Sequence, residues 1–156
     1  MSVPDVVVKT TDPLTVAEAI GVAPGFGPAL NETFQEVVPR VLAHLDVVNV
    51  KPGMMVAWYE EPRDDGSVVA HIGFEIDSPD ADPGDGVTVR SLPVIEVASL
   101  VHRGPMDDVV SDYEALVQWI EDSGFRIMGR SRELYREFHD DDWKRNITDL
   151  QMPIAR

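Results

Sequence analysis

The chain has 156 residues, with 13 basic and 28 acidic side chains, which gives a formal net charge of −15. This charge argues against a nucleic-acid binder, whose affinity comes mostly from neutralising phosphates, and the absence of cysteine excludes disulfides, thiol nucleophiles and thiolate metal sites. Met1–Leu14 lacks the layout of a signal peptide, and no apolar run approaches the roughly 18 residues of a membrane span, so we expect a soluble, cytoplasmic protein that does not act on membranes.

The predicted secondary structure follows the order β-α-β-β twice. In the first half, residue alternation indicates a strand in two pieces and two later strands, and helical spacing indicates one helix between them. The first strand covers Val6–Val8 and Thr15–Ile20, the helix covers Phe34–Leu45, and the later strands cover Met54–Tyr59 and Val68–Ile76. The second half repeats this order at Val87–Val89, Val94–His102, Val109–Ile120, Ile127–Phe138 and Ile147–Ile154. Open antiparallel sheets need one face covered, so we predict an α+β fold with the helices on one side.

The two halves also resemble each other in sequence. Val6–Ile20 reads VVVKTTDPLTVAEAI and Val87–Val101 reads VTVRSLPVIEVASLV, with valine and alanine at matching positions. A Gly-Pro pair follows each segment, at Gly27-Pro28 and at Gly104-Pro105. The run DSPDADPGDG between the halves is too rich in Pro, Gly and Asp for a helix or a central strand. We therefore predict one domain over residues 1–156, built from duplicated modules at about 3–77 and 87–156 with a linker at 78–86.

Strand alternation places one carboxylate in an otherwise apolar and aromatic row. In the first module Met55, Ala57 and Tyr59 share a face, and in the second Glu133 and Tyr135 share the matching face. The repeat pairs Glu133 with Ala57, so a charge replaces a methyl group. A carboxylate in such a groove is costly unless it meets a donor or a cation. This pattern indicates a pocket for a cationic or polar lipophilic molecule.

Two further expectations follow from the same alternation. Glu133 also fits a different interpretation, in which it is a solvated side chain on an ordinary strand and pairs with Arg132 or Arg136. Trp58 and Leu134 lie on the opposite faces of their strands, and we expect them to pack under the helices.

The segment from Val101 to Phe138 resembles a known family. It contains His102-Arg103-Gly104-Pro105, then a helix with Trp119-Ile120, then the strand motif Glu133-Leu134-Tyr135. Together with the closing segment Asp149–Ile154, these motifs are similar to the GyrI-like small-molecule-binding family, which includes the effector-binding domains of AraC- and MerR-type regulators. The resemblance implies paired β-α-β-β modules around a central cleft for lipophilic, often cationic molecules, with Glu133 as a ligand contact. It also implies a stand-alone ligand-binding member.

Residue pattern and resemblance together give a set of expected ligand contacts. These are Glu133, Tyr135, Tyr59, Met55, Ala57, Phe26, Met106 and Trp119. Trp119 also fits the apolar stripe of its helix, in which case it belongs to the core. No cofactor and no metal are expected, because the four histidines lack a ligand spacing. The expected function is binding of a lipophilic, cationic molecule for sensing or sequestration, by a monomer or a homodimer.

Two other function classes stay open at this point. Some stand-alone relatives that the chain resembles open cyclopropane-bearing electrophiles with water, and such a hydrolase would use Glu133 as general base. Tyr135 or Tyr59 would then donate a hydrogen bond to the leaving oxygen. The second alternative is a protein partner, including a gyrase-modulating role.

Overall fold

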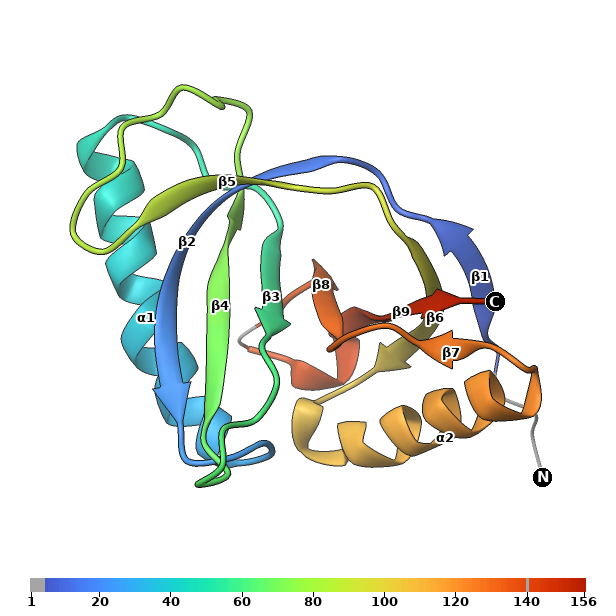
Figure 1. Ribbon diagram of the computed structural model, residues 1–156. Coiled ribbons are helices and arrows are strands. Elements are labelled where there is room, and N and C mark those ends of the chain that lie inside the picture. The colour runs from blue at the N-terminus through green and yellow to red at the C-terminus, as the bar shows by residue number, and fades with distance from the viewer. Residues whose placement is uncertain (1–4, 140) are drawn as a thin grey trace. The chain divides into compact units, whose positions relative to one another are not determined.

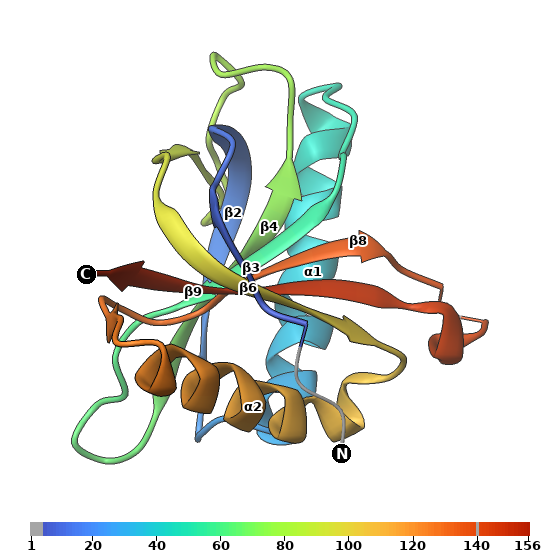
Figure 2. The ribbon, with the colours of Figure 1, turned by 90° about the vertical axis from the view of Figure 1, so that its right-hand side faces the viewer.

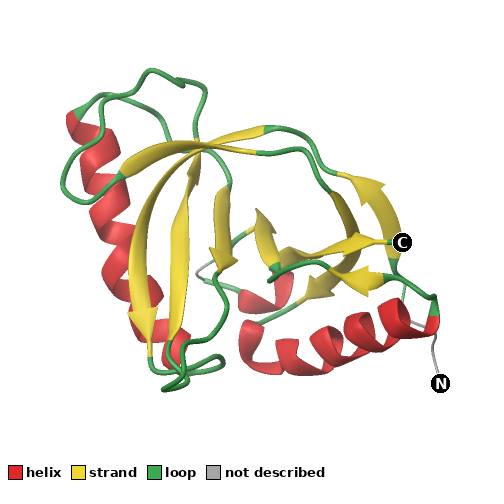
Figure 3. Ribbon diagram, viewed as in Figure 1, coloured by secondary structure: helices red, strands yellow, loops and turns green. Residues whose placement is uncertain are grey.

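The chain folds into two compact units, which the computed structural model describes over residues 5–139 and 141–156. One unit, here called the continuous unit, comprises Asp12–Pro93. The other, here called the split unit, combines Met1–Thr11 with Val94–Arg156. Each unit holds one α-helix and an antiparallel sheet, as the helices in red and the strands in yellow show in Figure 3.

In the continuous unit the helix covers one face of the sheet. The strands are β2 (Leu14–Ala23), β3 (Met55–Tyr59), β4 (Val68–Glu75) and β5 (Thr88–Leu92), in the order β3-β4-β2-β5, and the helix is α1 (Ala29–Val47). It runs beside β2 and β4 (Figure 1). The helix packs closely on Gly21, where an added Cβ would lie 2.5 Å from Thr33 and 2.9 Å from Val37. A glycine in β2 therefore lets the helix pack directly on the strand.

In the split unit the helix again covers one face. The sheet order is β1 (Val7–Thr10), β6 (Glu96–Arg103), β9 (Ile147–Ala155) and β8 (Arg132–Glu137), and β7 (Arg126–Ile127) also pairs with β9. Two short 3-10 helices, η1 (Met106–Asp108) and η2 (Trp143–Arg145), flank this framework. The helix α2 (Val109–Asp122) follows η1 (Figure 2). Among the described residues, no helix combines the length and apolar character needed to cross a membrane.

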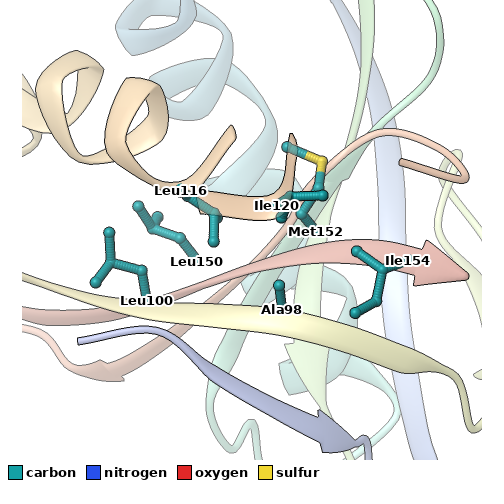
Figure 4. Packing of buried hydrophobic residues seen from close by; sticks show 7 residues of the cluster. All are labelled: Ala98, Leu100, Leu116, Ile120, Leu150, Met152 and Ile154. Carbon is teal, nitrogen blue, oxygen red and sulfur yellow. The ribbon is translucent and has the colours of Figure 1, made fainter. Parts of the chain in front are cut away.

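The core of the split unit lies between α2 and strands β6 and β9. Leu116 and Ile120 of α2 are fully buried and belong to one cluster with side chains of the two strands (Figure 4). These strand residues are Ala98, Leu100, Leu150, Met152 and Ile154. Full burial of one leucine or isoleucine contributes about 1.5–3 kcal/mol, so the predicted apolar stripe is the surface that holds α2 on its sheet.

The prediction of an α+β fold with antiparallel sheets is confirmed. The strand partners, however, differ from the predicted module boundaries. β1 pairs with β6 in the split unit, although we assigned the residues of β1 to the module at 3–77. Residues 3 and 4 of that predicted module lie outside the described residues. β5 likewise pairs with β2 in the continuous unit instead of joining 87–156. Alternation reveals which residues of a strand share a face, but it does not identify the strand beside it.

The expectation that Trp58 and Leu134 pack under the helices is wrong. In antiparallel pairs, directly opposite residues lie on the same face. Trp58 is opposite His71, whose strand neighbour Ala70 is opposite the helix-facing Gly21. Trp58 therefore lies on the face away from α1. Leu134 likewise lies on the opposite face from its strand neighbour Glu133, which is opposite the core residue Leu150.

A cluster of polar side chains contacts Trp58 on this face of the sheet, and two of them, His71 and Glu18, are buried. The His71 ring stacks on the indole with centroids 3.6 Å apart, and Trp58 Nε1 donates to Glu18 Oε1 at 3.0 Å. His71 Nδ1 lies 2.5 Å from Glu18 Oε2, and Nε2 lies 2.7 Å from Glu60 Oε2. Burial opposes a positive charge on His71, but the hydrogen bonds and charges of Glu18 and Glu60 outweigh burial and raise its pKa. The cluster is thus an ion-paired layer on the sheet.

Candidate functional site

Glu133 lies on β8 with its side chain on the same face as α2. It is directly opposite Leu150 of the core cluster, and only 4% of its surface is exposed. A buried carboxylate costs several kcal/mol unless hydrogen bonds or charges compensate it. The interpretation of Glu133 as a solvated side chain on an ordinary strand is therefore wrong.

Two tyrosine hydroxyls donate to the two oxygens of this carboxylate. Tyr135 lies two residues further along β8 on the same face, and its hydroxyl is 2.8 Å from Glu133 Oε1. Tyr113 approaches from α2, with its hydroxyl 2.5 Å from Glu133 Oε2. The single proton of Tyr113 is directed at Glu133, so Ser131 donates to the Tyr113 oxygen across 3.2 Å. Hydrogen bonds to an ionised acceptor are about twice as strong as neutral ones, so they hold Glu133 in one orientation.

The tyrosines satisfy hydrogen bonds without bringing a positive charge. Burial raises the pKa of Tyr113 well above its usual value, and the charge of Glu133 and the hydrogen bond to it raise the pKa further. Tyr113 is therefore a neutral donor at physiological pH. Tyr113 and Tyr135 thus hold the carboxylate of Glu133 between two hydroxyl donors on the α2 face of the sheet.

The other expected contacts of the split unit take up different positions. Met106 lies in η1, where its sulfur is 3.6 Å from the Thr148 hydroxyl, and Thr148 is directly opposite Tyr135. Met106 is therefore brought to the same part of the sheet face as Tyr135. Trp119 packs on the core cluster and stacks on Phe125 with ring centroids 6.1 Å apart. Its contacts fit the core interpretation that the sequence left open.

In the continuous unit the predicted contacts form an aromatic pair beside a small residue. Met55, Ala57 and Tyr59 of β3 are opposite Phe74, Ile72 and Ala70, and they share the face of the sheet that α1 covers. Phe26 lies edge-on to Tyr59, with ring centroids 5.5 Å apart. Tyr59 is 5% exposed, whereas Phe26 is 46% exposed. The roles of these residues as ligand contacts stay predictions.

The sequence reasoning missed Tyr113 as part of this site. Tyr113 belongs to the helical stripe of α2 with Leu116, Val117 and Ile120, and it also fits the helix pattern of the family that the chain resembles, but we did not include it among the expected ligand contacts. A signal was present, because a tyrosine within a buried stripe needs a partner for its hydroxyl. Glu133 is the strand residue that supplies the acceptor.

No group of three or more His, Asp or Glu side chains is arranged to hold a metal ion anywhere in residues 5–139 and 141–156.

The comparisons with known proteins agree with this architecture. The profile of the family described as a GyrI-like small molecule binding domain matches residues 25–155. The chain is 18% identical to the EcmrR C-terminal domain, with 99% of both chains covered and a TM-score of 0.78. It spans 58% of the EcmrR chain in a DNA complex, with 17% identity and a TM-score of 0.79. No curated protein sequence matches the chain significantly.

Two other solved structures share the fold. A hydrolase from Listeria innocua is 14% identical, with 96% of this chain and 91% of that chain covered and a TM-score of 0.62. SAV2435 bound to tetraphenylphosphonium is 15% identical, with 97% and 94% covered and a TM-score of 0.62. At these identities the likenesses show the fold alone.

Proposed function

Because the chain belongs to the GyrI-like family of small-molecule-binding domains, we propose that it binds a lipophilic cation and that Glu133 selects the charge of this ligand. The observation that carries the proposal is the 4% exposure of Glu133, with Tyr113 and Tyr135 donating to its two oxygens. Tetraphenylphosphonium, the ligand in the SAV2435 structure, belongs to the proposed chemical class and is a suitable probe.

Apolar contact supplies most of the proposed affinity. Burial of roughly 300 Å² of apolar ligand surface contributes on the order of 7 kcal/mol, from which association subtracts several kcal/mol. A cation about 4 Å from Glu133 gains roughly 4 kcal/mol at an effective dielectric constant near 20, before desolvation. A lipophilic cation is the ligand that draws on both contributions. Glu133 therefore acts mainly on selectivity, and affinity in the micromolar range is expected.

The substitution Glu133→Gln tests this division of roles. The amide keeps the shape of the side chain and removes the negative charge. We expect binding of methyltriphenylphosphonium to weaken by about tenfold or more, a loss of about 1.4 kcal/mol or more. Binding of triphenylphosphine oxide, which is neutral and of similar size, is expected to change by less than about threefold, because its burial is unaltered. Calorimetric titration of both compounds gives the two ratios.

The matched control is Glu137→Gln, which removes the same charge from an exposed position of the same strand. It is expected to bind both compounds as the unsubstituted protein does. Equal weakening of the cation and the neutral compound in Glu133→Gln would contradict a role in charge selection. If the unsubstituted protein binds neither compound, the proposed function itself is contradicted.

Hydrolysis is a second candidate, supported by the likeness to the Listeria innocua hydrolase and by the buried carboxylate. Glu133 would serve as general base toward a water, with Tyr135 donating to the leaving oxygen. Each oxygen of Glu133 already accepts a hydrogen bond from a tyrosine hydroxyl, so a water to be activated would have to donate to a second lone pair of one of these oxygens. This geometry favours binding over hydrolysis. Mass spectrometry of cyclopropane-bearing electrophiles incubated with the protein and with Glu133→Gln separates the two functions.

A further inference from the structure

A buried histidine joins the end of β6 to the start of α2. His102 is 2% exposed and lies near the end of β6. Its Nε2 lies 2.8 Å from the carbonyl oxygen of Pro105 and 3.3 Å from Asp108 Oδ1. Its Nδ1 lies 2.7 Å from Asp112 Oδ2. One imidazole therefore contacts the Gly-Pro turn, the residue before α2 and the first turn of α2.

The histidine supplies what the helix start otherwise lacks. The N-cap residue Asp108 makes no side-chain capping hydrogen bond, so ordinary capping does not hold the first turn. The turn before it requires Gly104, whose φ of 99° is unfavourable for other residues. Three oxygens face the two ring nitrogens, so both nitrogens of His102 have hydrogen-bonding partners at the start of the helix. Asp108 and Asp112 are the charged groups that face the ring.

The contact with Asp112 also determines which way the next residue points. Successive residues of an α-helix are about 100° apart around its axis. When Asp112 is held toward His102, the side chain of Tyr113 is directed to another side of the helix. There it reaches Ser131 and Glu133. A rotation or shift of the first turn would lengthen the 2.5 Å bond to Glu133.

We propose that His102 is a positioning residue for the ligand site, which holds the first turn of α2 so that Tyr113 donates to Glu133. This inference rests on the proposed function of Glu133, but the hydrogen bond itself exists without ligand. Met106 lies within the same tethered segment, between Pro105 and Asp112, so the contact also restrains the segment that carries this expected ligand contact.

The direct test is the hydroxyl proton of Tyr113 in proton NMR of the ligand-free protein. A short hydrogen bond to a carboxylate is expected to give a downfield, slowly exchanging signal, which Tyr113→Phe assigns by removing it. We expect His102→Gln and Asp112→Asn to shift this signal upfield or to abolish it. Asp107→Asn, which removes a neighbouring exposed charge, is the control and should leave the signal in place.

A double-mutant cycle then shows whether His102 acts through Tyr113. We expect His102→Gln to weaken methyltriphenylphosphonium binding by about 3- to 10-fold in the unsubstituted background and by less than about twofold in the Tyr113→Phe background. An unfolding curve for each variant confirms that it is folded, and Asp112→Asn serves in the cycle where His102→Gln does not fold.

Each result is decisive for one of the two proposals. An unchanged hydroxyl signal in both His102→Gln and Asp112→Asn would overturn the positioning role. Equal losses of binding in both backgrounds would overturn it as well. If the unsubstituted protein binds no phosphonium compound, the proposed function fails, while the NMR signal still decides whether His102 positions Tyr113.

Discussion

Replacement of Gly73 by alanine is expected to destabilise the protein by about 3 kcal/mol or more, the upper range for a side chain forced into a packed site. Gly73 lies in β4 directly opposite Glu18 of β2. A Cβ at this position would lie 2.0 Å from the carbonyl oxygen of Ala17 and 2.7 Å from the Cα of Glu18. Both atoms belong to the backbone, so a side-chain rotation cannot relieve the clash. The two strands would have to separate.

The separation would also disturb the polar cluster on the same strands. Glu18 accepts from Trp58 and contacts His71, which belongs to β4. A shift of β2 against β4 therefore weakens buried charged contacts in addition to the ladder between the strands. Urea unfolding followed by circular dichroism measures the effect. The control is Gly25→Ala, where the nearest atom to the added Cβ is 3.9 Å away. Equal unfolding midpoints for the two variants would contradict the prediction.

Asp149→Asn is expected to lower the free energy of unfolding by about 2–3 kcal/mol, because it removes the acceptor of a buried network. Asp149 is 2% exposed and lies on the sheet face away from α2. It accepts from Lys9 at 2.8 Å, Gln151 at 3.0 Å and Arg136 at 3.3 Å, and also from Ser99. An asparagine directs its amide hydrogens at donors. Lys9 and Arg136 are partly exposed and can turn to water, which limits the loss.

The same network produces an acid-dependent stability. Burial alone would raise the pKa of Asp149, but the hydrogen bonds from Lys9, Ser99 and Gln151 and the charge of Lys9 outweigh burial and lower the pKa. A lowered pKa in the folded state gives stability that is fully present above the unfolded value, near 4. This stability is lost as the pH falls through the folded pKa.

The measurement is the unfolding midpoint in urea between pH 7 and pH 2. We expect Asp149→Asn to lower the midpoint at pH 7 and to differ less from the unsubstituted protein as the pH approaches 2. Asp122→Asn, at an exposed position of α2, is the control and should follow the unsubstituted protein. A difference that does not change with pH would contradict the assignment to the charge of Asp149.

Much of the architecture was readable from residue patterns. Helical spacing of apolar residues predicted α2 at Val109–Ile120, and the structure has it at Val109–Asp122. Alternation predicted that Glu133 and Tyr135 share a face, and their hydrogen bond follows from this neighbourhood. These features depend on local geometry, which repeats every 3.6 residues in a helix and every 2 in a strand.

Features that depend on contacts distant in sequence were not readable. Tyr113 and Glu133 are twenty residues apart, and their hydrogen bond requires α2 to lie on the sheet at one rotation. Trp58 and Leu134 were assigned to the correct face relative to their strand neighbours but were expected to pack under the helices, because alternation defines two faces without stating which one a helix covers. For the same reason alternation did not reveal that β1 pairs with β6 and that β5 pairs with β2.

By itself the sequence determined the α+β class, the duplicated order of elements and the carboxylate at position 133 in an aromatic row. Only the tertiary structure decided the partners of that carboxylate, the polar clusters around His71 and Asp149, and the contact of His102 with the start of α2. The physical reason is that local periodicity is a property of one segment. A buried charge, in contrast, is held by whichever donors the packing of other segments brings within about 3 Å.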